Sequence, residues 1–160
     1  MRYFFDLDDT VIDSSHRQRI NADGSIDLAF WRANSTPEQI MLDAALPLAE
    51  TWRRAKAEGS IVSVCTSRIM SGADFAMLEN HGLTYDFCLS RRAWDDRPCG
   101  ELKLSMLREY AARIRSPWAR FCKTSVLFDD NIDVQETLGG AGFSVLDPVQ
   151  WNHYQQRRTA

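Results

Sequence analysis

The sequence predicts an α/β fold in which helices cover both faces of a mostly parallel β-sheet. Short apolar runs with strand character alternate along the chain with amphipathic, helix-like segments. Strands separated by helices imply right-handed crossovers between parallel strands. Acidic residues directly follow two of the apolar runs, those at residues 3–5 and 124–128. Because parallel strands end at one edge of a sheet, we expect a binding site at that edge.

Length and composition indicate one globular domain. The chain has 160 residues, of which 44% are hydrophobic and 26% charged, so it can bury a sizeable core, and we expect a single domain over residues 1–160. The net charge of −3 and the pI of about 5.6 argue against a protein that mainly grips long nucleic acid, because such proteins usually carry a basic face. A nucleotide or a strand end remains compatible with this charge.

The cysteines and the amino terminus point to a reducing compartment. The four cysteines show neither CxxC spacing nor zinc-type pairing with histidine, so reduced thiols are the simplest interpretation. The amino terminus lacks a charged segment followed by a long apolar stretch, and no window is long and apolar enough for a membrane span. We therefore expect a cytoplasmic protein without a membrane partner, and no feature indicates an obligate protein partner.

The first strand, residues 3–5, runs into a turn that holds Asp6, Asp8 and Asp9. Alternate residues of an extended chain point to the same side, so Asp6 and Asp8 can face one site while Leu7 packs on the other side. Like charges this close repel one another unless a cation lies between them. Hard carboxylate oxygens favour Mg²⁺ as that cation.

The next segment, residues 13–35, is polar and aperiodic. Loops of this length without secondary structure of their own are usually functional or disordered. Its Phe30-Trp31 pair suggests that something packs there, so we expect this segment to be a lid or a small cap insert beside the site.

Two helices and a strand are expected before the middle of the chain. Thr36 as N-cap predicts a helix from 36 to about 45, and Pro47 interrupts it and starts a second helix over 47–58. A second strand is expected over 60–65.

The rest of the chain continues the alternation. The capping-box pattern of Ser71 and Asp74 predicts a helix that runs to His81. The remaining expected elements are a strand at 85–89, an irregular segment at 91–100, a helix at 101–114, a strand at 124–128, a helix to about 138, a glycine-rich turn at 139–142 and a strand at 143–146.

Four groups of residues, in this order, resemble the motifs of a known family. They are the sequence Asp6-Leu7-Asp8-Asp9-Thr10, Thr66 at the end of the second strand, Lys103 on a later helix, and Asp129-Asp130 after the fourth strand. Together they resemble the four motifs of the haloacid dehalogenase-like (HAD) phosphatases over nearly the whole chain. The resemblance implies a Rossmann-like, HAD-type fold with a minimal cap and the hydrolysis of phosphate monoesters.

Attack of a carboxylate on an anionic phosphate monoester needs positive charge around it. We interpret Asp6 as the nucleophile that forms an aspartyl-phosphate, and Asp8 as the acid that protonates the leaving oxygen and later activates water. Thr66 and the amides of Ser67 and Arg68 would bind the phosphoryl oxygens, and Lys103 would offset the charge of Asp6 and phosphate.

The resemblance also implies the ligands of Mg²⁺. They would be the Asp6 side chain, the Asp8 backbone carbonyl and one acid of the last motif, with waters completing the shell. By analogy with the family we prefer Asp130, with Asp129 as the competing ligand.

The chain is most similar to the 3′-phosphatase domains of phage-type polynucleotide kinases. The Thr66-Ser67-Arg68 turn, the Arg91-Arg92 pair and the position of Arg17 after the first motif carry this similarity. It implies that Arg17, Ser67, Arg68 and Arg91 bind the phosphate or nucleotide of a nucleotide or nucleic-acid 3′ end, in the cytoplasm of a phage-infected bacterium.

Two departures from those domains leave alternatives open. Cys99 stands four residues before Lys103, where an aspartate is expected, and there is no GxxxxGK[ST] kinase motif. A deoxynucleoside 5′-monophosphatase is the alternative enzyme, and a non-catalytic binding module on a HAD fold is the alternative outside enzymes. A module of that kind would have lost a chemical residue, yet all of those named above are present.

Overall fold

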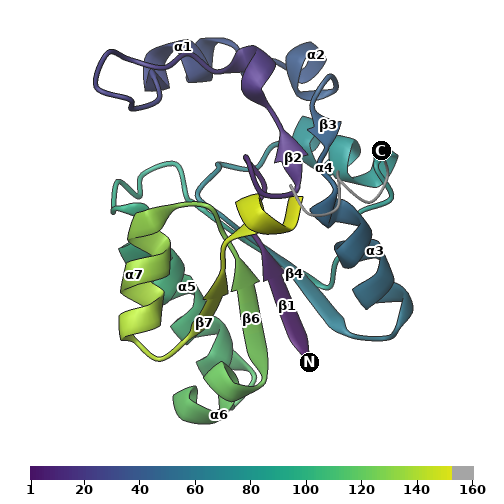
Figure 1. The fold of residues 1–160 in the computed structure, drawn as a ribbon, viewed down its shortest axis with the longest axis vertical. Coiled ribbons are helices and arrows are strands. Elements are labelled where there is room, and N and C mark those ends of the chain that lie inside the picture. Colours follow the sequence, from purple (N-terminus) through teal and green to yellow (C-terminus); the bar gives the residue numbers. More distant parts are fainter. Residues whose placement is uncertain (153–160) are drawn as a thin grey trace.

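The computed structural model describes residues 1–152, so the end of the domain expected over 1–160 lies outside the described residues. Its centre is a five-stranded sheet in the order β5-β4-β1-β6-β7 (Figure 1). All four pairings between neighbouring strands are parallel. The strands are β1 (Arg2–Phe5), β4 (Ile61–Thr66), β5 (Phe87–Ser90), β6 (Ser125–Phe128) and β7 (Ser144–Leu146). The predicted fold class is confirmed.

Strand β1 lies in the middle of the sheet and supplies side chains to both cores. Phe5 stacks on Trp52 at 4.9 Å and on Phe128 at 5.0 Å between ring centroids, while Phe4 packs edge-on against Tyr110 at 5.8 Å. Successive residues of a strand point to opposite faces, so these adjacent phenylalanines anchor two separate layers. A central strand so fixed holds the residue after it, Asp6, in a defined position.

Helices cover both faces of the sheet, as predicted. The core around Phe5 is closed by α3 (Leu48–Ala57) and α4 (Gly72–Asn80), and the core around Phe4 by α5 (Cys99–Arg113), α6 (Trp118–Lys123) and α7 (Ile132–Gly140). The capping box of Ser71 and Asp74 opens α4 as expected.

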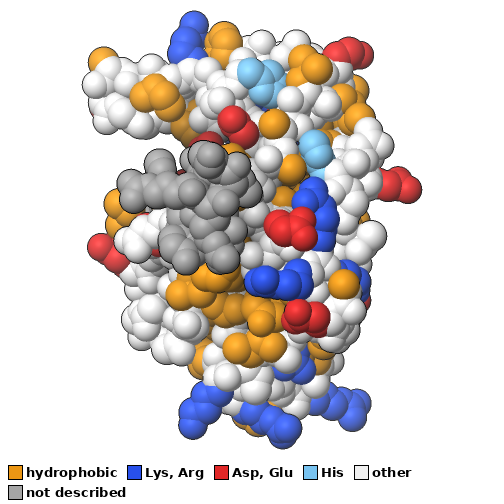
Figure 2. All heavy atoms as spheres, turned by 45° about the vertical axis from the view of Figure 1, so that its right-hand side comes forward, with side chains coloured by type: hydrophobic (Ala, Val, Ile, Leu, Met, Phe, Trp, Pro, Cys, Tyr) orange, Lys and Arg blue, Asp and Glu red, His pale blue; other side chains and the backbone are white. Residues whose placement is uncertain are grey.

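A small cap stands above the edge of the sheet at which the parallel strands end (Figure 1). Its stem is the antiparallel pair β2 (Ile12–Asp13) and β3 (Ala44–Ala45). Between these strands lie a 3₁₀ turn at Ser15–Arg17 and the helices α1 (Leu28–Ala33) and α2 (Pro37–Ile40). We call residues 14–43 the cap, and Figure 2 shows it as the upper lobe of the molecule.

Two expectations for this region are wrong. The segment 13–35 has secondary structure of its own, because Asp27 caps α1 by accepting a hydrogen bond from the Phe30 amide. Helix α2 ends at Ile40 rather than near Ala45. The reason is tertiary: the Asp43 carboxylate turns inward to an ion pair with Arg17, and the chain then pairs with β2.

The second half of the chain differs from the sequence expectation mainly at the ends of its elements. Strand β5 begins at Phe87, α5 begins at Cys99, and α7 continues through Gly140 into the expected turn. Helix α6 was not expected, since six residues carry too little periodicity to be recognised. Among residues 1–152, no helix is long and apolar enough to cross a bilayer.

The contact between α5 and α7 depends on a glycine. A Cβ atom on Gly100 would lie 2.5 Å from Thr137 Oγ1 and 2.7 Å from the Asp133 carbonyl oxygen. The Gly100 amide donates to the Asp133 carboxylate at 2.7 Å. This close approach seats the first turn of α5, and with it Lys103, against the sheet.

We therefore expect Gly100→Ala to lower the free energy of unfolding by about 1–3 kcal/mol, the usual cost of overpacking. Denaturant titration would measure this loss. The control is Gly139→Ala in α7, where a Cβ meets nothing within 4 Å and alanine favours the helix. Equal stability of the two variants would contradict the close-packing argument.

Candidate active site

Three carboxylates meet at the carboxyl edge of the sheet. Asp6 follows β1, and Asp129 and Asp130 follow the neighbouring strand β6. One oxygen from each lies within 4.8 Å of the others. The structure thus brings together the first and last acidic groups that the sequence singled out, because β1 and β6 pair in register.

Lys103 joins these acids from the opposite side. Its side chain is 1% exposed and its Nζ lies 2.6 Å from Asp129 Oδ2 and 3.0 Å from Asp6 Oδ1. Burial lowers the pKa of Lys103, but the charges of Asp6 and Asp129 outweigh it and raise the pKa well above its usual value. The charged form of Lys103 is therefore favoured within the site.

The site can accommodate a further cation. Burial and the charge of Asp6 raise the pKa of Asp129 to about 7 and that of Asp130 to about 6, which reflects three carboxylates beside one lysine. Asp6 Oδ1 is buried and has no hydrogen-bond partner among residues 1–152, since its 3.0 Å approach to Lys103 lacks hydrogen-bond geometry. Carboxylate oxygens with unmet charge are the donor set that Mg²⁺ prefers, so the residues present fit this ion.

The turn after β4 supplies hydroxyl and amide groups. Thr66 is 1% exposed, and its Oγ1 accepts a hydrogen bond from the Arg68 amide at 3.1 Å. This leaves the hydroxyl proton of Thr66 free to donate. The Ser67 hydroxyl oxygen is buried without a hydrogen-bond partner in the described part of the chain. Thr66, Ser67 and Arg68 line one pocket together with Asp6 and Lys103.

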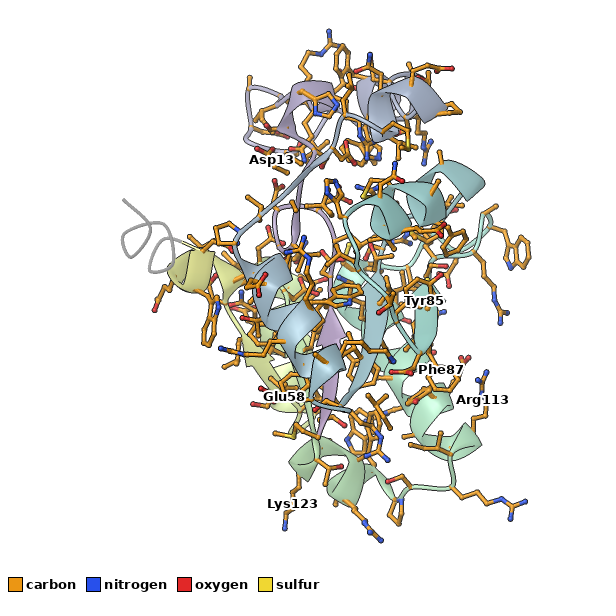
Figure 3. All side chains as sticks on the ribbon, turned by 90° about the vertical axis from the view of Figure 1, so that its right-hand side faces the viewer. Asp13, Glu58, Tyr85, Phe87, Arg113 and Lys123 are labelled. Atoms are coloured by element: carbon orange, nitrogen blue, oxygen red, sulfur yellow. The ribbon has the colours of Figure 1, made fainter. Side chains whose placement is uncertain are left out.

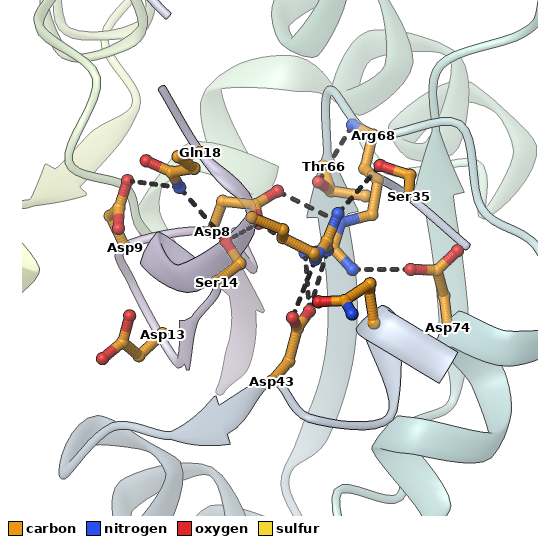
Figure 4. A network of polar contacts seen from close by, with 12 residues as sticks. Asp8, Asp9, Asp13, Ser14, Gln18, Ser35, Asp43, Thr66, Arg68 and Asp74 are labelled. Atoms are coloured by element: carbon orange, nitrogen blue, oxygen red, sulfur yellow. Dashed lines mark hydrogen bonds and ion pairs between the residues drawn. The ribbon is translucent and has the colours of Figure 1, made fainter. Parts of the chain in front are cut away.

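Arg68 binds several carboxylates at once (Figure 4). Its guanidinium donates to both oxygens of Asp8 and, at 2.5 Å, to Asp74, and it lies 3.4 Å from Asp43. Burial raises the pKa of Asp8, but Arg68 and the Ser14 hydroxyl outweigh it and hold the pKa below its usual value. Asp8 is thus held charged and oriented at the side of the pocket.

Arg17 belongs to the cap and is buried, with 1% of its side chain exposed. It donates to both oxygens of Asp43 at 2.8 Å and to Ser35 at 2.9 Å, and its guanidinium stacks on the Trp31 ring at 4.1 Å. All three guanidinium nitrogens are therefore engaged within the protein. A substrate-binding role for Arg17 stays a prediction.

Arg91 is similarly engaged. Its guanidinium donates to the carbonyl oxygens of Ser67 at 2.9 Å, Asp95 at 2.6 Å and Arg97 at 2.9 Å. These bonds hold segment 91–98 against the Thr66 turn, so substrate binding by Arg91 also stays a prediction. Cys99, which replaces the expected aspartate, lines the pocket and contacts Arg91 at 3.8 Å rather than Lys103.

The cap contributes an apolar wall. The pocket over the carboxylates has a volume of about 210 Å³, and Ile26, Leu28 and Trp31 line it from the cap. A larger pocket of about 530 Å³ adjoins it and shares Leu28, Trp31 and Arg68. The site thus has a small charged end and a larger, partly apolar end.

Sequence reasoning missed two carboxylates of this site, Asp43 and Asp74. Asp43 was assigned to a continuing helix, and Asp74 was recognised as a capping residue without its bond to Arg68. Nothing local distinguishes Asp43, because its partner lies 26 residues away. The capping box already accounted for an acidic residue at Asp74, so nothing in the sequence indicated that Asp74 also binds Arg68.

Comparison with known proteins identifies one matching sequence family and several solved structures with a similar fold. A family model described as bacteriophage T5 5′-deoxynucleotidase matches residues 1–95. The 5′-deoxynucleotidase of Escherichia phage T5 is 32% identical over 83 residues, which cover 49% of this chain and 34% of that protein. The chain thus spans about a third of the length of this curated relative.

Solved structures resemble the chain over most of its length. A haloacid dehalogenase-like hydrolase from Streptococcus pneumoniae has a TM-score of 0.64 and 11% identity, covering 96% of this chain and 97% of that one. A chain of the Pnkp1/Rnl/Hen1 complex has a TM-score of 0.64 and 19% identity, and the match covers 91% of this chain and 44% of that one. At these identities the likeness shows the fold, and it confirms the HAD-type architecture that the motifs implied.

The buried Arg17–Asp43 pair predicts a large effect of a small substitution. Asp43→Asn leaves the Arg17 charge buried without its partner, so we expect the free energy of unfolding to fall by about 3–5 kcal/mol. Denaturant titration would measure it, with hydrogen exchange locating the loss in the cap. The control is Glu50→Gln, which removes an exposed ion pair with Arg53 and should change stability little. A similar small effect of both substitutions would contradict the role given to Asp43.

Proposed function

The chain belongs to the bacteriophage T5 5′-deoxynucleotidase family, and we propose that it is a magnesium-dependent phosphomonoesterase that acts on deoxynucleoside 5′-monophosphates. The observation that carries the proposal is the cluster of Asp6, Asp129 and Asp130 around Lys103, beneath a pocket that the cap lines on one side. The description of the matching family favours the 5′-phosphate of a free deoxynucleotide as substrate.

Hydrolysis would proceed through an aspartyl-phosphate in two steps. The Asp6 carboxylate attacks phosphorus and the bond from phosphorus to the leaving oxygen breaks. That oxygen takes a proton from Asp8, which would bind this proton from solvent when the phosphoryl group draws the Arg68 guanidinium away from it. In the second step Asp8 accepts a proton from water, the water oxygen attacks phosphorus, and the bond to Asp6 breaks. Inorganic phosphate leaves and both carboxyl groups return to their starting states.

Residues around Asp6 would stabilise the charge that develops in both steps. Lys103 would offset the charge of the nucleophile, and the Thr66 hydroxyl and the buried Ser67 hydroxyl would donate to phosphoryl oxygens; all three residues line the same pocket. Arg68 lies on the same wall and can share its guanidinium between Asp8 and the phosphoryl group. The Ser67 hydroxyl, which has no hydrogen-bond partner among the described residues, would be available to donate to a phosphoryl oxygen.

The magnesium ligands would be the Asp6 side chain, the Asp8 carbonyl and Asp130. Both oxygens of Asp129 already accept hydrogen bonds, from Lys103 at 2.6 Å and from the Asn131 amide at 3.1 Å. Asp130 accepts one long bond, from Thr10 at 3.4 Å, and so keeps capacity for a ligand. When bound, Mg²⁺ supplies positive charge against that of the nucleophile and the phosphoryl oxygens.

A nucleic-acid 3′-phosphate end is the second candidate substrate. The observation that favours it is the pocket of about 530 Å³ that continues from the site past Trp31 and has room for more than a phosphoryl group and a sugar. A free nucleotide uses the same space for its base, so the reaction itself is common to both candidates.

Asp6→Asn keeps the shape of the turn but removes the nucleophile. We expect kcat to fall by about four orders of magnitude or more on any phosphate ester that the wild type cleaves. Phosphate release in magnesium buffer measures it.

The matched control is Asp9→Asn in the same turn. Asp9 has φ 56°, a left-handed conformation that asparagine tolerates, so this variant should keep activity of the wild-type order. Full hydrolysis by Asp6→Asn would contradict the nucleophile, and hydrolysis that survives EDTA would contradict the metal.

A substrate panel tests the specificity. Ile26 and Leu28 in the cap wall offer no polar partner to a ribose 2′-hydroxyl that lies against them, so kcat/KM should be about tenfold or more higher for dAMP than for AMP. The panel should also contain 3′-dAMP, a 3′-phosphorylated oligonucleotide and p-nitrophenyl phosphate. Highest kcat/KM on the oligonucleotide would assign the second candidate instead, and equal values throughout would contradict both nucleotide assignments.

A further inference from the structure

Segment 91–98 separates two cavities. On one side lies the pocket that adjoins the active site, and on the other a groove of about 510 Å³ bounded by β5 and α5, which we call the outer groove. We propose that the outer groove is a second, non-catalytic binding surface for a nucleotide unit, with the base stacked on Trp94 and the phosphate held by Arg92 and Arg113. This proposal does not depend on which ester the active site hydrolyses.

Trp94 is placed unlike the other tryptophans. Its side chain is 77% exposed, and among residues 1–152 it has neither an aromatic neighbour nor a hydrogen-bond partner. By contrast, the indole N–H groups of Trp52, Trp118 and Trp151 donate hydrogen bonds, and Trp31 lies under Arg17. An open indole leaves a large apolar face in water, and such a face is suited to stacking a nucleobase.

The outer groove also has unpaired positive charge. Four arginines and two carboxylates line it, and Arg97 is paired with Asp95 at 2.6 Å. Within the described part of the chain, Arg92 and Arg113 have no carboxylate at ion-pair distance. Arg113 instead lies over the Phe87 ring, 5.2 Å from its centroid, on the face that Figure 3 presents. On a chain of net charge −3, two guanidinium groups without a described carboxylate partner in the same groove as an open indole favour an anionic aromatic ligand.

The segment that carries Trp94 is held in shape before any ligand arrives. Arg91 binds the carbonyl oxygens of Asp95 and Arg97, and the Asp95 amide donates to the Arg92 carbonyl at 3.0 Å. The Asp95 carboxylate accepts three bonds from Arg97. A preorganised surface loses little conformational entropy on binding, so an exposed tryptophan there can contribute its full stacking energy.

A nucleotide unit can come from a free nucleotide or from single-stranded nucleic acid. Both present a planar base next to a phosphate, and the outer groove cannot distinguish them by that chemistry. A strand that crossed segment 91–98 would reach the active-site pocket, because Arg91, Asp95 and Arg97 line both cavities. The source is therefore left to the experiment.

The test uses the full chain carrying Asp6→Asn, so that no probe is turned over. The probes are a labelled single-stranded hexanucleotide without terminal phosphate, followed by fluorescence anisotropy, and dAMP, followed by calorimetry. We expect Trp94→Ala and the double variant Arg92→Ala/Arg113→Ala each to raise Kd for at least one probe about tenfold, while Trp94→Phe binds nearly as wild type. The control is Arg120→Ala/Lys123→Ala, which removes the same charge from the exposed face of α6.

Each outcome decides the proposal. If the groove variants raise Kd for the hexanucleotide alone, the ligand is a single strand. If calorimetry shows a second dAMP site besides the active site and the groove variants raise its Kd, the ligand is a free nucleotide. Unchanged Kd values in both groove variants, or losses equal to those of the control, would overturn the outer groove as a binding surface. Because Trp94→Ala without Asp6→Asn should keep its kcat on p-nitrophenyl phosphate, failure here is distinguishable from failure of the proposed hydrolysis.

Discussion

The buried contact of Lys103 with Asp6 and Asp129 is the interaction on which the arrangement of the site depends. One ammonium group offsets two carboxylates where almost no water reaches them, and a third carboxylate, Asp130, stands beside them. Removing water from a charge costs several kcal/mol, and only well-placed partners compensate. Strand β1 in mid-sheet and the close contact of α5 with α7 at Gly100 give that placement. The packing of β1 in the sheet and of α5 against α7 therefore fixes the positions of these charged groups.

A second charged network joins the cap to the sheet. Arg68 contacts Asp8 and Asp74 in the body of the protein and Asp43 at the foot of the cap, and Asp43 in turn binds Arg17 inside the cap. Because one buried carboxylate serves both arginines, the position of the cap and the orientation of Asp8 are linked. This linkage gives Arg17 a physical task that differs from direct substrate contact, and places the apolar wall of the cap over the pocket.

Segment 91–98 likewise contributes to two parts of the molecule, the active-site pocket on its inner side and the outer groove on its other side. Arg91 ties it to the Thr66 turn through the Ser67 carbonyl, so its inner face forms part of the site. The same bonds stiffen the outer face, where Trp94 stands exposed. An irregular segment can be rigid when a guanidinium satisfies its carbonyl groups, and rigidity is what makes an exposed indole useful as a binding surface.

The sequence by itself determined the sheet, the order of its strands along the chain and the meeting of Asp6 with Asp129-Asp130 at one edge. Those features follow from local apolar patterns and from the rule that parallel strands end together. Only the tertiary structure decided what Arg17, Arg68 and Arg91 bind, that Asp43 and Asp74 belong to the site, and that the cap contains helix α1. Ion pairs between residues far apart in the chain produce no periodic pattern in the sequence. A helix of six residues is too short to produce a recognisable period. Tertiary packing alone therefore decides these features.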